Sequence, residues 1–356
     1  MLISHILELF DYSAWANGKL FEVAEVLDDE DLDRGFDIGP GTLREVVRHI
    51  YGAERIWYER IGGTGYSESR SREELEDVGD LKSAWESLNA ARESWLQSLG
   101  DADLAKAIAY TNMAGDPFET RLGDILTHVC DHGAHHRAQA ANMTRHIGEP
   151  FRNSDYLFFR LAHPTVAPPT AETIDFLRGA DIEVGEAAAR PRSLSLSGMR
   201  DLFAYNDWAN DLLLDAAKQL SDEQLDREFE MGMGTLRKTL LHVESAERFW
   251  GDHWAGDEKP HWQDMDASIR MADLVEAWRL VRQRREESFR GFDDAALLDE
   301  VVAEPAPGMF LTFRRGETML QIAQHGTHHR AQALNMLRRL ADISLQMSII
   351  VFTRRK

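Results

Sequence analysis

The apolar residues at the start of the chain recur at helical spacing. Within residues 3–27 they fall mostly three or four positions apart, at Ile6, Leu7, Phe10, Ala14, Leu20, Phe21, Ala24 and Leu27. This spacing favours an amphipathic helix over the strict alternation of a half-buried strand. We therefore expect the chain to open with a helix that buries one face.

Three further helices are expected after it. Thr42 opens the second through a capping-box pattern, and this helix runs to about Ile61. A third is expected over 81–99 and a fourth over about 122–146, with a polar stretch at 112–117 between them. Four consecutive helices predict a four-helix bundle of the up-down type.

The whole pattern occurs twice. Residues 41–57, GTLREVVRHIYGAERIW, return as GTLRKTLLHVESAERFW at 234–250, and HGAHHRAQAANM at 132–143 returns as HGTHHRAQALNM at 325–336. Both pairs are separated by the same 193 positions, so the register holds without a net insertion. We interpret the chain as a tandem duplication. The helices of the second copy are expected at 197–220, 235–252, 272–290 and 316–341.

A proline-rich segment separates the two copies. Residues 163–193 contain four prolines together with small and acidic residues, which is typical of a connector. The length of 356 residues also exceeds what one core usually supports. We predict an all-α protein of two fused four-helix bundles, at 1–164 and 196–356, with a linker at 165–195.

Charge and cysteine content narrow the class of protein. The net charge of -21 gives an acidic surface that repels phosphate backbones, which argues against nucleic-acid binding. Cys130 is the single cysteine, which rules out an internal disulfide and any multi-cysteine zinc motif. The start of the chain lacks a signal-peptide pattern, and no apolar stretch approaches the length of a bilayer. We expect a cytoplasmic protein that binds no membrane and acts on a small molecule.

Histidines carry the candidate chemistry. His132 and His136 lie four positions apart on the expected fourth helix and so share one face, and His49 on the second helix is the candidate third ligand. The offset of the repeat carries this triad onto His242, His325 and His329. Three neutral imidazoles around a divalent ion leave an open coordination position, as in reactive metal sites. The alternative is a solvated helix face, but the recurrence of the separate third histidine favours a metal centre.

The roles of other residues near the first triad are judged by the residues at the matching positions of the second copy. His128 lies four positions before His132 and corresponds to Gln321, a poor ligand. We therefore expect His128 to lie behind the ligands without binding the ion, or at the surface. His135 and His328 occur in both copies and are expected to donate a hydrogen bond or to contact substrate. Cys130 corresponds to an alanine, so we expect a small buried residue rather than a nucleophile.

The charged residues leave the acid and base unassigned. Arg137 and Arg330 follow the last ligands, and two roles stay open for them. Their planar forks could bind a substrate carboxylate, or they could brace the bundle through a buried pair. Glu54 and Glu247 also recur, and we expect surface ion pairs with helix neighbours such as Arg55 rather than a general base.

The order of these motifs resembles the DinB/YfiT-like superfamily of four-helix bundles. The matching residues are Trp15, Asn17, His49, His132, His136 and Arg137, and in the second copy Trp208, Asn210, His242, His325, His329 and Arg330. The resemblance covers nearly the whole chain apart from the connector. It implies a metal triad in each copy, with zinc or nickel as the usual ion and iron or manganese as further options. Since such proteins often pair, it also implies that the two copies form an internal pseudo-dimer, with a monomer as one option for the oligomeric state.

The resemblance implies an activity as well. Some relatives are similar to S-transferases that use bacillithiol or mycothiol, and others to thiol-dependent maleylpyruvate isomerases. An open histidine-bound metal can hold a thiol as thiolate, or lower the pKa of a bound water to about 7 for hydrolysis. We therefore expect a metal-dependent thiol S-transferase or related hydrolase acting on a small electrophile. The alternative is a non-catalytic metal- or ligand-binding protein with one or both sites vestigial.

Overall fold

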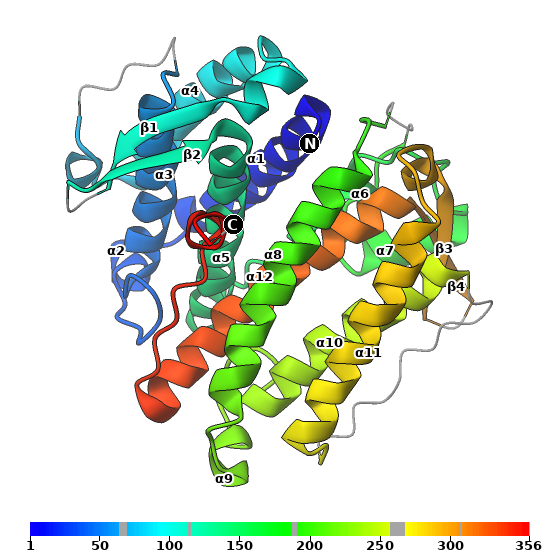
Figure 1. Cartoon of the computed structure of the whole chain (residues 1–356). Helices are drawn as coiled ribbons and strands as arrows, with labels where there is room; N and C mark the ends of the chain where they lie inside the picture. The colour runs from blue at the N-terminus through cyan, green and yellow to red at the C-terminus, as the bar shows by residue number, and fades with distance from the viewer. Residues whose placement is uncertain (64–69, 113–114, 187–190, 257–267, 307, 356) are drawn as a thin grey trace. The chain divides into compact units, whose positions relative to one another are not determined.

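The computed structural model describes residues 1–63, 70–112, 115–186, 191–256, 268–306 and 308–355 (Figure 1). The chain divides into two compact units. Unit 1 comprises Met1–Arg152 and Gln346–Lys356, and unit 2 comprises Asn153–Leu345. Each unit is a helical bundle with one two-stranded hairpin, which confirms the predicted fold of two fused helical bundles.

Four long helices build the bundle of unit 1. They are α1 (Ile3–Glu25), α3 (Leu43–Arg60), α4 (Val78–Gln97) and α5 (Leu122–Ile147). Both α1 and α3 pack against α4 and α5. Thr42 caps α3 as its sequence indicates, since its hydroxyl accepts a hydrogen bond from the amide of Glu45 at 3.2 Å. The four elements therefore lie close to where apolar periodicity places them.

Short elements connect these helices. They are α2 (Asp29–Leu32), the 3-10 turns η1 (Arg72–Glu74) and η2 (Asp101–Ala105), and the strands β1 (Ala107–Thr111) and β2 (Pro117–Arg121). The strands pair antiparallel from Ala107 opposite Arg121 to Thr111 opposite Pro117. Apolar periodicity misses this hairpin because its strands are short and half exposed.

Unit 2 repeats the plan. Its bundle consists of α8 (Leu196–Ala217), α10 (Leu236–Ala255), α11 (Met271–Arg290) and α12 (Arg315–Ala341). The shorter elements are α9 (Asp222–Leu225), η3 (Ala295–Leu298), β3 (Glu300–Ala306) and β4 (Met309–Arg314). Within the expected linker, α7 (Ala171–Gly179) is capped by the hydroxyl of Thr170, and residues 187–190 lie outside the described part.

The segment after each fourth helix joins the compact unit that contains the fourth helix of the other repeat. α6 (Tyr156–Ala162) follows the first repeat and packs on α12, and α13 (Ile349–Thr353) follows the second and packs on α5. The compact units thus exchange these segments between repeats. The limits of 1–164 and 196–356 stay a prediction about the duplication.

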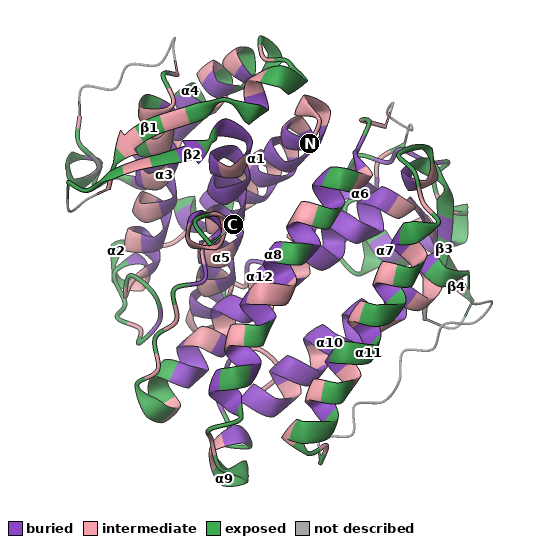
Figure 2. Ribbon diagram, in the orientation of Figure 1, coloured by how far each residue is buried: buried purple, intermediate pink, exposed green. Residues whose placement is uncertain are grey.

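The cores are formed by the inward helix faces, which are buried throughout both bundles (Figure 2). Large side chains such as Phe21 and Phe203 are about 1% exposed, and each contributes on the order of 2–3 kcal/mol through burial. None of the helices in the described ranges has the length and apolar character needed to cross a membrane.

Candidate metal centres

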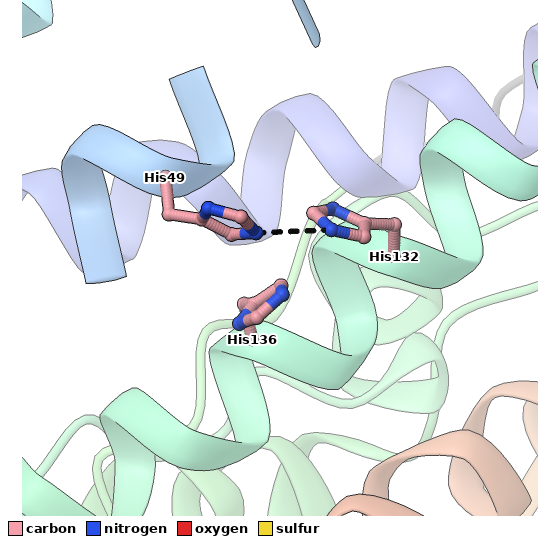
Figure 3. Close-up of side chains that lie close together, drawn as sticks. All are labelled: His49, His132 and His136. Atoms are coloured by element: carbon pink, nitrogen blue, oxygen red, sulfur yellow. Dashed lines mark hydrogen bonds between the residues drawn. The ribbon is translucent and has the colours of Figure 1, made fainter. Parts of the chain in front are cut away.

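The first predicted triad converges in unit 1. His49 comes from α3, whereas His132 and His136 lie one turn apart on α5, and the three rings point toward a common centre (Figure 3). The Nε2 atoms of His49 and His132 are 3.2 Å apart. One ring nitrogen from each residue lies within 4.8 Å of the other two. This arrangement can hold one metal ion, because each ring offers a nitrogen to the same point.

The second triad has the same geometry in unit 2. His242 from α10 faces His325 and His329 on α12, and the Nε2 atoms of His242 and His325 are 3.1 Å apart. The candidate ligand atoms again lie within 4.8 Å of one another. α3 packs on α5, and α10 packs on α12. Equivalent pairs of helices therefore position the two triads.

Burial holds the imidazoles in the neutral form. Desolvation, reinforced by neighbouring imidazoles, lowers the pKa of His132 and His136 well below the usual value, and it does the same for His325 and His329. Burial also lowers the pKa of His242. Metal binding requires the unprotonated ring, so these rings are ready to bind at neutral pH without first losing a proton.

A glutamine fixes the last ligand of each triad. Nδ1 of His136 lies 2.8 Å from Oε1 of Gln139. Since an amide oxygen only accepts, Nδ1 is the donor and Nε2 keeps its lone pair for the centre. The amide nitrogen of Gln139 then donates to Nε2 of His135 at 3.1 Å. His135 therefore accepts this bond, whereas the sequence led us to expect a donor or a substrate contact.

Unit 2 contains the same relay. Nδ1 of His329 lies 2.7 Å from Oε1 of Gln332, whose amide nitrogen lies 3.1 Å from Nε2 of His328. Sequence reasoning missed both glutamines. The available signal was their presence in both repeats, three positions after the last ligand.

A glycine in the loop before the second helix of each bundle approaches this glutamine. Gly39 has a φ of 49°, and a Cβ added to it would lie 2.1 Å from Oε1 of Gln139. Gly232 has a φ of 54°, and its added Cβ would lie 3.0 Å from Oε1 of Gln332. A side chain at position 39 would displace Gln139, which orients the ligand, whereas one at position 232 would press on Gln332 and, at 2.9 Å, on the hydroxyl of Thr239. Close packing as well as backbone conformation therefore calls for glycine at both positions.

The arginines that follow the last ligands are buried and bonded to the first helix of each bundle. Arg137 donates to Oδ1 of Asn17 at 2.9 Å and to Oγ of Ser13 at 3.2 Å. Arg330 donates to Oδ1 of Asn206 at 2.9 Å. These contacts tie the fourth helix to the first, which favours the bracing role over the binding of a substrate carboxylate.

The expectation for Glu54 was wrong. Its side chain is buried, and its Oε2 accepts from Arg92 at 2.6 Å, whereas Arg55 pairs with Glu59 at 2.9 Å. The reason is that position 54 falls on the inward face of α3 with the buried Tyr51 and Tyr58.

Glu247 is buried in the same way and pairs with Arg285 at 3.0 Å, and burial raises its pKa. Both glutamates therefore brace the bundle from within.

The other two residues that the sequence singled out near the first triad, His128 and Cys130, are both buried. His128 is buried, and its ring centroid is 5.7 Å from that of His132 and 5.6 Å from that of Trp57. It lies beside the triad but outside the group of convergent atoms. Cys130 is buried, and burial raises the pKa of its thiol, which suits an inert core residue better than a nucleophile.

Comparison with known proteins gives two matches. The family model described as the DinB family matches residues 1–169 and again residues 193–354. Protein DinB of Bacillus subtilis (strain 168) is 22% identical over 156 residues, which are 42% of this chain and 90% of that protein. One relative of single-repeat length and two family matches are what a duplicated chain would give.

Proposed function

The chain belongs to the DinB family, and from that premise we propose that it is a metal-dependent thiol S-transferase with one three-histidine centre in each repeat. The observation that carries this proposal is the convergence of three imidazoles in both bundles, within 4.8 Å each time. We assign His49, His132 and His136 to the first centre, and His242, His325 and His329 to the second.

The donor set fits a divalent ion. All donors are ring nitrogens, which suit zinc and nickel better than manganese, an ion that prefers oxygen ligands. The hydrogen bond from Nδ1 of His136 to Gln139 fixes the ring and makes Nε2 the ligating atom. We therefore propose zinc or nickel as the ion, and iron as the next option.

The chain's own residues prepare each centre for a thiol. When bound, the ion would hold a low-molecular-weight thiol as its thiolate, which is the nucleophilic form. Three protein donors leave a position for that sulfur, and the neutral rings add no negative charge that would repel it. The buried Glu54 and Glu247 are occupied by arginines, so neither is placed as the base that hydrolysis would need. This favours thiol transfer over hydrolysis.

The proposed substrate is a small electrophile, and the proposed compartment is the cytoplasm, where such thiols stay reduced. A non-catalytic metal-binding protein is the competing function. It gains support from Arg137, Arg330, Glu54 and Glu247, because all four brace the bundles instead of facing the triads.

Turnover of an electrophile tests the proposal. The purified metal-loaded protein is mixed with monochlorobimane and either cysteine, glutathione or bacillithiol, and the fluorescent conjugate is measured. We expect turnover that falls at least about a hundredfold in the His49→Ala/His242→Ala double variant, because both centres lose a ligand.

The matched control is His146→Gln, which changes a histidine at the end of α5, away from the triad. It should retain full turnover. Conjugation that proceeds equally well in the double variant, or only at the uncatalysed rate with the loaded protein, would exclude the transferase.

A further inference from the structure

A strip of partly accessible side chains runs along α3 from the first triad. Residues four, eight and eleven positions after His49 share its side of the helix. They are Ala53, Trp57 and Arg60, and all three keep part of their surface accessible, as His49 itself does. At a rise of about 1.5 Å per residue, Trp57 lies about 12 Å along the helix from His49. A ligand held at the triad and extended along this side of α3 would therefore meet Trp57 and Arg60.

Aromatic rings continue from the triad to the hairpin of unit 1. The ring centroid of His128 lies 5.7 Å from that of His132 and 5.6 Å from that of Trp57. The ring of Tyr110 on β1 lies 5.0 Å from that of Trp57 and 5.9 Å from that of Phe118 on β2. The last three rings are half buried, so each presents part of its surface to a ligand. We call these four residues, His128, Trp57, Tyr110 and Phe118, the aromatic wall.

Two guanidinium groups lie on the aromatic wall. The guanidinium of Arg60 lies 5.0 Å from the ring centroid of Trp57 and 5.7 Å from that of Tyr110. The guanidinium of Arg354, at the end of α13 in the same unit, lies 3.5 Å from the ring centroid of Phe118. Within the part of the chain that the structure describes, neither group has an ion-pair partner. Attraction to a ring face leaves the N–H donors of an arginine available, so the wall offers two cations to an acidic group.

Unit 2 lacks both arginines and two of the rings at the matching positions. With the offset of the repeat, Arg60, Tyr110, Phe118 and Arg354 correspond to His253, Ala303, Leu311 and Leu161.

The strip is also covered in unit 2. Trp250 corresponds to Trp57 and is 7% exposed, and Ala246 corresponds to Ala53 and is 3% exposed. His253 is engaged locally, since its Nδ1 lies 2.9 Å from the carbonyl oxygen of Phe249. The two centres therefore share their ligands but differ in what lies beside them.

We propose that the first centre takes an elongated ligand, with a metal-binding group at one end and a carboxylate about 12 Å away, whereas the second takes a compact one. The planar forks of Arg60 and Arg354 suit a carboxylate, and the aromatic wall suits an apolar or planar middle part. The inference names the substrate class of the proposed function and rests on it in one respect, that both triads hold a divalent ion.

Hydroxamates provide a test that does not depend on turnover, because they bind divalent ions directly. The His242→Ala variant isolates the first centre and His49→Ala isolates the second. Each is loaded with cobalt(II), whose visible absorption reports both metal uptake and ligand binding. The probes are acetohydroxamate, biphenyl hydroxamate, and biphenyl hydroxamate with a carboxylate at its far end.

The first centre should distinguish all three probes. We expect it to bind biphenyl hydroxamate more tightly than acetohydroxamate, and the carboxylate to raise the affinity by a further factor of about ten, as a charge-assisted pair would. At the second centre the carboxylate should change the affinity by less than about twofold.

Removing the arginines should remove this gain. In the isolated first centre, the Arg60→Met/Arg354→Met double variant should bind the two biphenyl compounds equally, with unchanged cobalt uptake. The matched control is Arg34→Met. It removes a guanidinium that lies 5.5 Å from the ring of Phe36 and donates to the carbonyl oxygen of His146, near the opposite end of α5 from His128. This control should keep the full gain.

The outcomes separate this inference from the proposed function. The inference is overturned, and the metal centres stand, if the cobalt-loaded first centre shows no gain from the carboxylate, or prefers acetohydroxamate to biphenyl hydroxamate. An equal gain at the second centre, or one that persists in the double variant, has the same meaning. Failure of the triads to take up cobalt would overturn the proposed function as well. A selective gain without thiol turnover would support the inference and count against the transferase alone.

Discussion

Replacing Arg92 by methionine should destabilise unit 1 strongly. Arg92 donates to Oε2 of Glu54 at 2.6 Å, and both side chains are about 3% exposed. The Arg92→Met variant keeps most of the volume but leaves the carboxylate buried without its cation. Breaking one partner of such a pair costs about 3–5 kcal/mol.

The remaining partners of Glu54 limit the loss without preventing it. Asn17 and Trp85 still donate to the carboxylate, at 2.9 Å and 3.2 Å. For a unit of this size each kcal/mol lowers the unfolding temperature by about 2–4 °C, so we expect a fall of about 6–20 °C. Calorimetry of the metal-free protein measures this, because it can resolve the unfolding of the two units.

Two variants make the result specific. Arg55→Met breaks the pair with the exposed Glu59, which is worth about 0–1 kcal/mol, and a hydrogen bond to the carbonyl oxygen of Arg70, which is worth about 0.5–1.5 kcal/mol. It strands no buried charge, so the unfolding temperature should fall much less than in Arg92→Met. Adding Glu54→Leu to Arg92→Met should restore much of the loss, because it removes the stranded charge. If Arg92→Met is as mild as Arg55→Met, the reasoning about a buried ion pair is refuted.

Three further outcomes are expected. Gln139→Ala should weaken metal binding at the first centre by about 10–100-fold, because His136 loses the acceptor that orients it. Competition with a chromophoric chelator measures the affinity. An unchanged affinity would rule out an orienting role for Gln139. Gly39→Ala should have a similar effect through the displaced Gln139, while Gly35→Ala, where an added Cβ meets nothing within 4 Å, should not. Burial lowers the pKa of His5 to about 4, so the unfolded chain binds this proton more tightly than the folded one. As the pH drops from about 6.5 to about 4, His5 alone should contribute a loss of about 3 kcal/mol to the free energy of unfolding. Acid titration of the unfolding free energy measures this, and a His5→Gln variant with the same acid sensitivity as the parent would contradict it.

The helices and the triads were predictable because their signals are periodic. Amphipathic spacing reports burial directly, and a histidine pair four positions apart must share a helix face. The duplication added an internal check, since residues with a functional role in both copies had to recur. His49, otherwise one histidine among several, became a candidate on that basis.

The missed features depend on contacts between distant segments. Glu54 carries a charge that suggests solvent, and only the packing of α4 on α3 shows that Arg92 meets it in the core. Gln139 has no periodic signal, and its partner Gly39 lies on a separate loop. The packing of α6 on α12 brings the amide of Leu157 to Gln321, and the local sequence gives no signal for that contact.

The metal content of the purified protein tests the central claim most directly. Protein prepared without chelators and analysed by mass spectrometry of its metals should contain two divalent ions per chain. The ratio should fall to one in His49→Ala or in His242→Ala and to none in the double variant. A parent chain that binds no metal, or variants that keep the parent's ratio, would contradict the assignment of the two histidine triads as metal centres.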